Sequence, residues 1–155
     1  MSSITSKHKN SLVVLLDYKM PCNASIIRWN YYSRGNGNDV NGAVFRQTGN
    51  HTFKLIGFQT LSGTQAGIVS VDVPVDQRIA VKSGDFLGIF TTVENSSVLT
   101  YDISLDVKPP GYTAVEYIRY SKYATQYDLA AGTEFTTRLI KRNKYRRYAF
   151  NVDLA

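Results

Sequence analysis

The chain has 155 residues, a length at which folding buries about 70% of the surface that the unfolded chain exposes, so one domain with one core is sufficient. Its 18 basic and 12 acidic side chains give a net charge of +6, which biases the molecule toward anionic partners. The single cysteine, Cys22, excludes an internal disulfide, and the sequence has no run of about 18 apolar residues that would predict a membrane span.

The composition favours β-structure, because 11 Tyr and 7 Phe accompany frequent Val, Ile and Thr. Residues 1–10 are polar and are expected to form a flexible tail ahead of a single domain over residues 11–155. Apolar residues that alternate or cluster between turn residues predict strands over residues 11–18, 25–33, 42–47, 52–61, 69–73, 79–81, 86–92, 98–107 and 114–120. Residues 134–141 and 145–154 are predicted to pair as a terminal hairpin around residues 142–144.

The stretch SIIRWNYYS, residues 25–33, shows the period of two that is typical of a strand with one face on a core. Its expected faces are Ile27, Trp29 and Tyr31 toward the core, and Arg28, Asn30 and Tyr32 toward solvent.

Two glycines lie inside predicted strands. The run from Phe86 is apolar on both faces and predicts a central strand that is covered on both sides, with Gly88 marking the place where a bulky group crosses it. Gly57 predicts a bulge or a close backbone approach. With no convincing helix and no repeat, we expect an all-β fold: an antiparallel two-sheet β-sandwich, jelly-roll-like, of about ten strands.

Three stretches carry a family resemblance: IIRWNYYSR followed by AVFRQTGNHTFKLIGFQT, then VPVDQRIAVKSGDFLGIF, and last TTRLIKRNKYRRYAFNVDL. Together they resemble a loosely defined β-sandwich module that recurs in secreted proteins and receptor ectodomains of marine invertebrates, including polycystin-like receptors. The most specific part is the pattern built on Asp76, Arg78, Gly84 and Asp85. Such modules often carry a second cysteine, which this chain lacks. The resemblance implies an extracellular β-sandwich and brings no activity with it.

The first candidate site is the loop RGNGNDVNG, residues 34–42. Oxygen donors on a glycine-rich backbone suit a hard cation such as calcium, but one carboxylate is too little charge for tight binding, so no cofactor is expected and calcium is the one candidate. Aromatic and basic side chains at the edge of the loop add stacking and hydrogen bonding for a sugar or a peptide. The residues of this site are Tyr31, Tyr32, Arg34, Asn36, Asn38 and Asp39. The alternative is an ordinary flexible connection between strands.

The second candidate site is a set of cations at the predicted terminal hairpin, with Tyr145 and Tyr148 between them. Its expected ligand-binding residues are Lys141, Arg142, Lys144, Arg146 and Arg147. So dense a positive charge favours an anion such as a sulfated glycan or an acidic protein. The alternative is a solvated edge whose charges prevent strand-to-strand aggregation.

Two further patterns bear on partners and location. The sequons at Asn23, Asn50 and Asn95 predict glycosylation, and therefore a secreted protein or an ectodomain. The five tyrosines between residues 112 and 127 are suited to an interface, which makes a homo-oligomer a second expectation. Nucleic acid is not expected as a partner.

Catalytic motifs are absent from the sequence: it contains no HExxH, CxxC, GxSxG or phosphate loop, so we expect no enzyme. The predicted function is a non-catalytic extracellular recognition or adhesion module that binds glycan or protein through its loops and the basic C-terminal hairpin. One alternative is a self-assembling subunit of a matrix or coat. The other is a glycan-active hydrolase, for which the nominal carboxylate pairs are Asp72 with Asp76 and Asp102 with Asp106.

Overall fold

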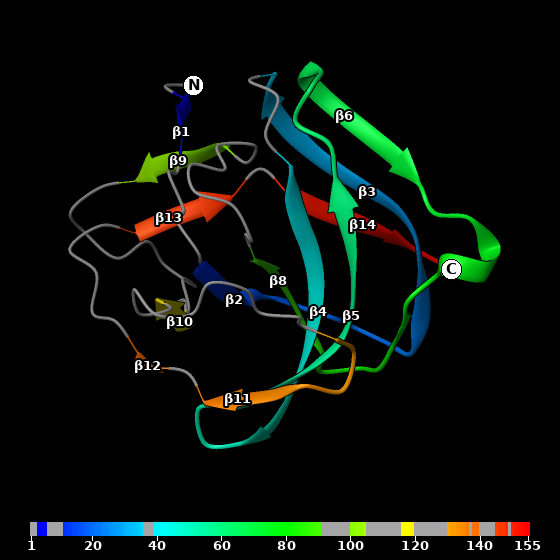
Figure 1. The fold of residues 1–155 in the computed structure, drawn as a ribbon, viewed down its shortest axis with the longest axis vertical. Coiled ribbons are helices and arrows are strands. Elements are labelled where there is room, and N and C mark those ends of the chain that lie inside the picture. The colour runs from blue at the N-terminus through cyan, green and yellow to red at the C-terminus, as the bar shows by residue number, and fades with distance from the viewer. Residues whose placement is uncertain are drawn as a thin grey trace.

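The computed structural model of the chain describes residues 3–5, 11–35, 39–90, 100–104, 116–119, 130–136, 138–139, 145–148 and 150–155. These residues form β-strands and one short 3-10 turn, η1 (Val75–Gln77), and every pairing between the described strands is antiparallel (Figure 1). The predicted all-β, antiparallel sandwich is therefore confirmed.

The strands fall into three hydrogen-bonded sheets. The seven-stranded sheet has the order β11 (Glu134–Thr136), β5 (Thr52–Leu61), β4 (Val40–Gly49), β8 (Phe86–Phe90), β2 (Ser11–Lys19), β10 (Glu116–Arg119) and β12 (Arg138–Leu139). The four-stranded sheet has the order β14 (Phe150–Leu154), β3 (Ala24–Arg34) and β6 (Ala66–Asp72), with β7 (Ala80–Val81) also paired to β3. The three-stranded sheet has the order β1 (Ser3–Thr5), β9 (Thr100–Ser104) and β13 (Tyr145–Tyr148).

The chain crosses repeatedly between the two larger sheets, as the jelly-roll prediction requires. It passes from β2 to β3, from β3 to β4, from β5 to β6 and from β7 to β8, and each of these steps leaves one sheet for the other. Apolar faces of both sheets are thereby brought together around one interior.

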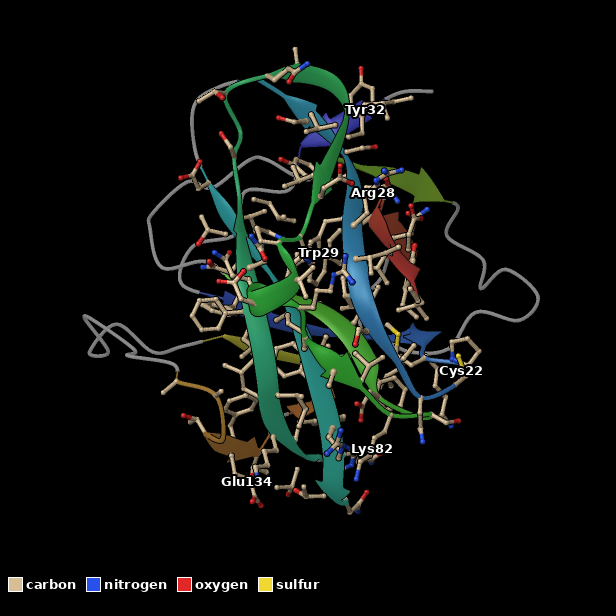
Figure 2. The ribbon with its side chains drawn as sticks, turned by 90° about the vertical axis from the view of Figure 1, so that its right-hand side faces the viewer. Cys22, Arg28, Trp29, Tyr32, Lys82 and Glu134 are labelled. Carbon is tan, nitrogen blue, oxygen red and sulfur yellow. The ribbon has the colours of Figure 1, made fainter. Side chains whose placement is uncertain are left out.

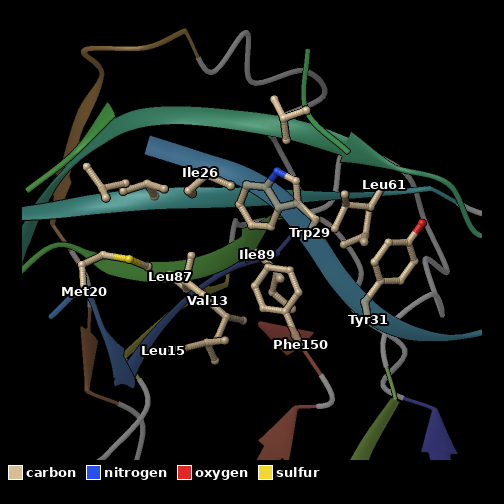
Figure 3. Packing of buried hydrophobic residues seen from close by; sticks show 14 of the residues in the cluster. Val13, Leu15, Met20, Ile26, Trp29, Tyr31, Leu61, Leu87, Ile89 and Phe150 are labelled. Carbon is tan, nitrogen blue, oxygen red and sulfur yellow. The ribbon is translucent and has the colours of Figure 1, made fainter. Parts of the chain in front are cut away.

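The core between these sheets is built around Trp29, which is fully buried and stacks on Phe150 with 5.4 Å between ring centroids (Figure 3). The seven-stranded sheet contributes side chains such as Val13 and Ile89, and the four-stranded sheet contributes Ile26. Side chains point alternately to the two faces of a strand, so every second side chain of each strand contributes to this core.

A second cluster of buried side chains covers the opposite face of the seven-stranded sheet. It includes Phe45, Phe53, Phe86 and Phe90, and Phe135 packs edge-on against Phe45 with 5.8 Å between ring centroids. All five residues of β8 are buried, with Leu87 and Ile89 in the first core and Phe86 and Phe90 in the second. The prediction of a central strand covered on both sides is confirmed.

Both predicted glycine positions prove to be close contacts. A Cβ built on Gly88 would lie 2.3 Å from Phe45 Cε2 and 2.4 Å from the Val13 carbonyl oxygen, so the Phe45 ring is the bulky group that crosses β8. At Gly57 a Cβ would lie 3.1 Å from Ile79, and the register between β4 and β5 shifts beside it, between Val44 and Phe45.

One expected core position is wrong by a single residue. Ile26 is fully buried in the first core, whereas Ile27 is only half-buried. The cause is an irregularity in the pairing of β14 with β3, where the register shifts between Asp153 and Leu154. An extra residue in one strand reverses the face that the following side chains occupy, and a simple period of two does not predict it.

The predicted terminal hairpin is also wrong, because each described strand of its two arms pairs with a strand elsewhere in the chain. β11 pairs with β5, β12 with β10, β13 with β9 and β14 with β3. Phe135 packs against the second core and Phe150 lies in the first, on opposite faces of the seven-stranded sheet. The two arms are therefore drawn to different layers rather than to one another. Part of the expected flexible tail is a strand as well, since Ser3–Thr5 pair with Thr100–Asp102.

The turn KSGD is fixed by a buried carboxylate. Asp85 is 1% exposed and accepts hydrogen bonds from Arg46 Nε at 2.8 Å, Arg46 Nη2 at 2.9 Å and the Lys82 backbone N–H at 2.7 Å. The hydrogen bond with Asp85 raises the pKa of Arg46 above its ordinary value. This two-pronged ion pair ties the start of β8 to β4 and sets the register of the central strands.

Candidate functional site

Polar side chains cover the outer face of the four-stranded sheet, where three strands lie side by side. In the first row, the register places Arg28 of β3 between Asp72 of β6 and Asp153 of β14. In the second row, two residues further along β3, it places Asn30 between Ser70 and Asn151. We call these six residues the polar face. Side chains two residues apart on one strand are about 6.5 to 7 Å apart, so the two rows are adjacent.

Asn30 is the centre of the polar face. Its amide nitrogen donates to Asn151 Oδ1 at 2.9 Å and to Asp153 Oδ1 at 3.0 Å, and its amide oxygen accepts from Ser70 Oγ at 2.8 Å. Both amide hydrogens and the oxygen are thereby used, which fixes its orientation. Asn30 thereby positions side chains on both neighbouring strands, β6 and β14.

Arg28 links the two carboxylates of the polar face. Its Nε donates to Asp72 Oδ1 at 2.6 Å, and its Nη1 lies 3.6 Å from Asp153 Oδ2. The hydrogen bond with Asp72 raises the pKa of Arg28. About half of the Arg28 side chain remains exposed to solvent. Exposed ion pairs contribute little to stability, so changes to this face should leave the fold intact.

An apolar pair continues the polar face toward the end of the sheet. Tyr32 of β3 is 36% exposed and lies opposite Ile68 of β6, which is 81% exposed. Figure 2 shows Tyr32 and Arg28 along β3 in the upper half of the molecule, away from Lys82 at the lower end. The outer face of the sheet therefore presents one aromatic and one aliphatic side chain, Tyr32 and Ile68, beside a network of hydrogen-bond donors and acceptors.

The end of β3 and the start of β4 lie beside the turn after β5. β3 ends at Arg34, which pairs with Ala66, and β4 begins at Val40, which pairs with Leu61. Asp39, next to Val40, accepts a hydrogen bond from the Gly63 backbone N–H at 3.3 Å. The turn after β5 belongs to the same end of the sandwich as the predicted ligand loop.

Tyr31, an expected ligand-binding residue, lies in the core. It is 3% exposed, and its hydroxyl donates to the Ser62 carbonyl oxygen at 2.8 Å. Burial, and secondarily the Asp39 carboxylate, raise the pKa of Tyr31. The prediction that Tyr31 and Tyr32 share a binding surface is wrong, because adjacent residues of a strand point to opposite faces.

The remaining expected residues of the loop and of the basic segment are placed only in part. Arg34 ends β3, and Arg146 and Arg147 lie in β13 opposite Ile103 and Asp102, while the side chains of all three are outside the described structure. Asn36, Asn38, Lys141, Arg142 and Lys144 lie outside the described residues.

Two of the three sequon asparagines are on the surface. Asn50 is exposed in the two-residue turn between β4 and β5, and Asn23 is exposed before β3, where its Oδ1 accepts from the Ser83 backbone N–H at 2.9 Å. Asn95 lies outside the described residues. Cys22, next to Asn23, is exposed and unpaired in the part of the chain that the structure covers.

The described ranges also bear on metal binding and on membrane spans. Within them, no group of three or more His, Cys, Asp or Glu side chains could hold a metal ion. Nor does any helix in those ranges have the length and apolar character needed to cross a membrane. Of the nominal hydrolase carboxylates, Asp72 is engaged by Arg28, and Asp76 is exposed in η1.

Sequence reasoning identified the solvent side of β3 but missed the polar face as a unit. Arg28, Asn30 and Tyr32 follow from alternation, and Ser70 and Asp72 follow in the same way on β6. Asn151 and Asp153 could not be added, because the sequence does not reveal that β14 lies beside β3. The exposed Ile68, flanked by glycine and valine, was the one signal that could have drawn attention to this edge.

No protein-family model, no curated protein and no solved structure matches this chain.

Proposed function

We propose that the chain is a non-catalytic extracellular recognition module whose polar face, together with Tyr32, binds a neutral glycan. The observation that carries this proposal is the side-chain network across β6, β3 and β14, in which Asn30 holds Ser70, Asn151 and Asp153 at hydrogen-bond distance. Such a network is organised before a ligand arrives, which lowers the entropic cost of binding.

The chemistry of this face suits hydroxyl groups. A hydroxyl both donates and accepts, and the face offers guanidinium and amide donors beside carboxylate acceptors. Two carboxylates, Asp72 and Asp153, outnumber the one cation, Arg28, so an anionic ligand would be repelled on balance. Tyr32 adds an exposed ring of amphipathic character on which the apolar face of a sugar can lie.

The exposed positions of Asn23 and Asn50 support an extracellular location, because a sequon must be accessible to be glycosylated. Asn23 follows Cys22, which Figure 2 shows away from Tyr32, and Asn50 follows the end of β4 that is opposite Val40 and the turn after β5. Glycans attached there would leave the polar face open.

A glycan array with and without EDTA tests the proposal. We expect binding to neutral glycans that persists in EDTA, since the polar face needs no metal ion. Tyr32→Ala and Arg28→Ala should each weaken binding about tenfold, as truncation of central aromatic and arginine side chains commonly does. Lys82→Ala is the matched control for lost charge, because Lys82 is exposed at the other end of the sandwich. Binding that disappears in EDTA would move the site to the loop at residues 34–42.

The basic segment is a second candidate surface, for an anionic extracellular partner. It is supported by the cations at positions 141, 142, 144, 146 and 147 of the sequence. The test is retention on a heparin column, comparing the wild type with a variant in which all five are Gln. The variant should elute at clearly lower salt because fewer cations engage the sulfates. Elution of both proteins at the same salt concentration would rule out the basic segment as an anion-binding surface.

A further inference from the structure

β6 is an edge strand, and its outer side has no partner strand in the described structure. It is the last strand in the order β14, β3, β6, and Figure 1 shows it at the outer margin of the four-stranded sheet. Every second residue of such a strand directs its backbone N–H and C=O away from the sheet, where they can pair with another chain.

The edge has little of the side-chain protection that natural edge strands commonly have. Charged residues, prolines and very short length normally prevent pairing between edges. β6 has seven residues, AGIVSVD, and no proline. Its one charge, Asp72, is at its end and already bonded to Arg28. The whole stretch from residue 61 to residue 71 contains no charged side chain.

The edge also exposes the most accessible large apolar side chain among the described residues, Ile68, at 81%. Tyr32, 36% exposed, lies directly beside it on β3. An exposed aliphatic side chain on an unprotected edge is the combination expected where another strand adds to a sheet.

We infer that β6 pairs antiparallel with β6 of a second copy of this chain, about a two-fold axis that passes near Ile68. In this register Ile68 faces its own symmetry mate, and Tyr32 of each copy flanks the pair. Ala66 faces Ser70 of the second copy, so no charges oppose one another. Two molecules of charge +6 can meet here because the contacting stretch is uncharged.

The size of the edge sets the expected affinity. Pairing of about five residues on each side buries less than the roughly 1,200 Å² of a standard interface, so the dimer should be weak, with a dissociation constant of about 10⁻⁵ to 10⁻³ M. In the dimer the polar faces of both copies join into one continuous sheet surface. A ligand with repeated units would then be held at two places at once.

This inference does not depend on the glycan proposal, because it needs only the backbone edge and Ile68. It is tested without any ligand, by sedimentation velocity from about 10 µM to about 1 mM. We expect the wild type to dimerise reversibly over this range. Ile68→Lys should raise the dissociation constant at least tenfold, because two ammonium groups would face each other across the axis.

Val75→Lys is the matched control, since Val75 is 77% exposed and lies in η1, outside β6. It adds the same charge and should change the dissociation constant less than about twofold. Both positions are exposed, so both variants should fold, which circular dichroism checks.

Cysteine crosslinking tests the register. In a Cys22→Ser background, Ile68→Cys should form a disulfide-linked dimer on mild oxidation, because facing residues of an antiparallel pair have Cβ atoms about 4.5 to 5.5 Å apart. Val75→Cys in the same background should not. A wild type that stays monomeric at the highest concentration, a dimer that Ile68→Lys leaves intact, an equal effect of both lysine variants, or equal crosslinking of both cysteines would each overturn the inference.

Discussion

Gly88 offers the sharpest test of the packing on both faces of the central strand. A methyl group added there would lie 2.3 Å from the Phe45 ring and 2.4 Å from the Val13 carbonyl oxygen, both far inside van der Waals contact. The ring can rotate or shift, but the carbonyl belongs to the neighbouring strand β2 and moves only if β2 and β8 separate. Overpacking of this kind costs about 1 to 3 kcal/mol, and because two directions are obstructed, Gly88→Ala should cost about 3 kcal/mol. That is a large part of a typical total of about 5 to 15 kcal/mol.

Urea unfolding measures this cost, with fluorescence of the single, buried tryptophan, Trp29, as the signal. Gly49→Ala is the matched control, because a Cβ there would make only ordinary contact, 3.5 Å from Thr52. Phe45→Leu should recover part of the loss in the Gly88→Ala background, since the obstructing carbonyl would remain. If Gly88→Ala were as stable as Gly49→Ala, the argument that Phe45 crosses β8 at this position would be refuted.

Three other outcomes follow from the described contacts. Asp85→Ala should lower the free energy of unfolding by about 2 to 4 kcal/mol, because Arg46 loses a buried partner. Urea unfolding of Asp85→Ala, Arg46→Ala and the double variant would show whether the two residues act as a pair. Tyr31→Phe should cost about 1 kcal/mol near neutral pH through loss of the hydroxyl bond to Ser62. The raised pKa keeps the Tyr31 hydroxyl protonated in the fold, whereas in the unfolded chain it ionises at about pH 10. The stability that Tyr31 contributes is therefore present at neutral pH and is lost as the pH rises through about 10. The Phe variant should lose less stability between about pH 9 and pH 11, and an identical slope would contradict burial of the hydroxyl. Secretion from a eukaryotic host should give a mass shift at Asn50 that Asn50→Gln abolishes, and an unmodified secreted chain would contradict use of that sequon.

The sequence predicted the strands well because the period of two is a local property. Residues 52–61 match β5 at both ends, the bulge predicted at Gly57 lies beside it, and Gly88 lies where the Phe45 ring crosses β8. Each of these conclusions depends only on neighbouring residues along one strand.

The sequence could not predict which strands become neighbours. The arms at 134–141 and 145–154 are near in sequence and alternate in the same way, so a hairpin was the simplest expectation, yet Phe135 and Phe150 enter different cores. The same limit applies to the candidate site, since the polar face exists only because β14 lies against β3. The bulge that places Ile26 rather than Ile27 in the core is likewise a result of pairing between distant segments.

The complete burial of β8 has a consequence for how the molecule opens. A strand enclosed by side chains above and below, and hydrogen-bonded to β4 and β2 on its two sides, cannot exchange its amide protons with solvent through local fluctuation. In deuterium exchange its amides should be the slowest of the described chain and should report the global free energy of unfolding, whereas those on the outer side of β6 should exchange first. The molecule is thus expected to combine a rigid centre with an accessible margin.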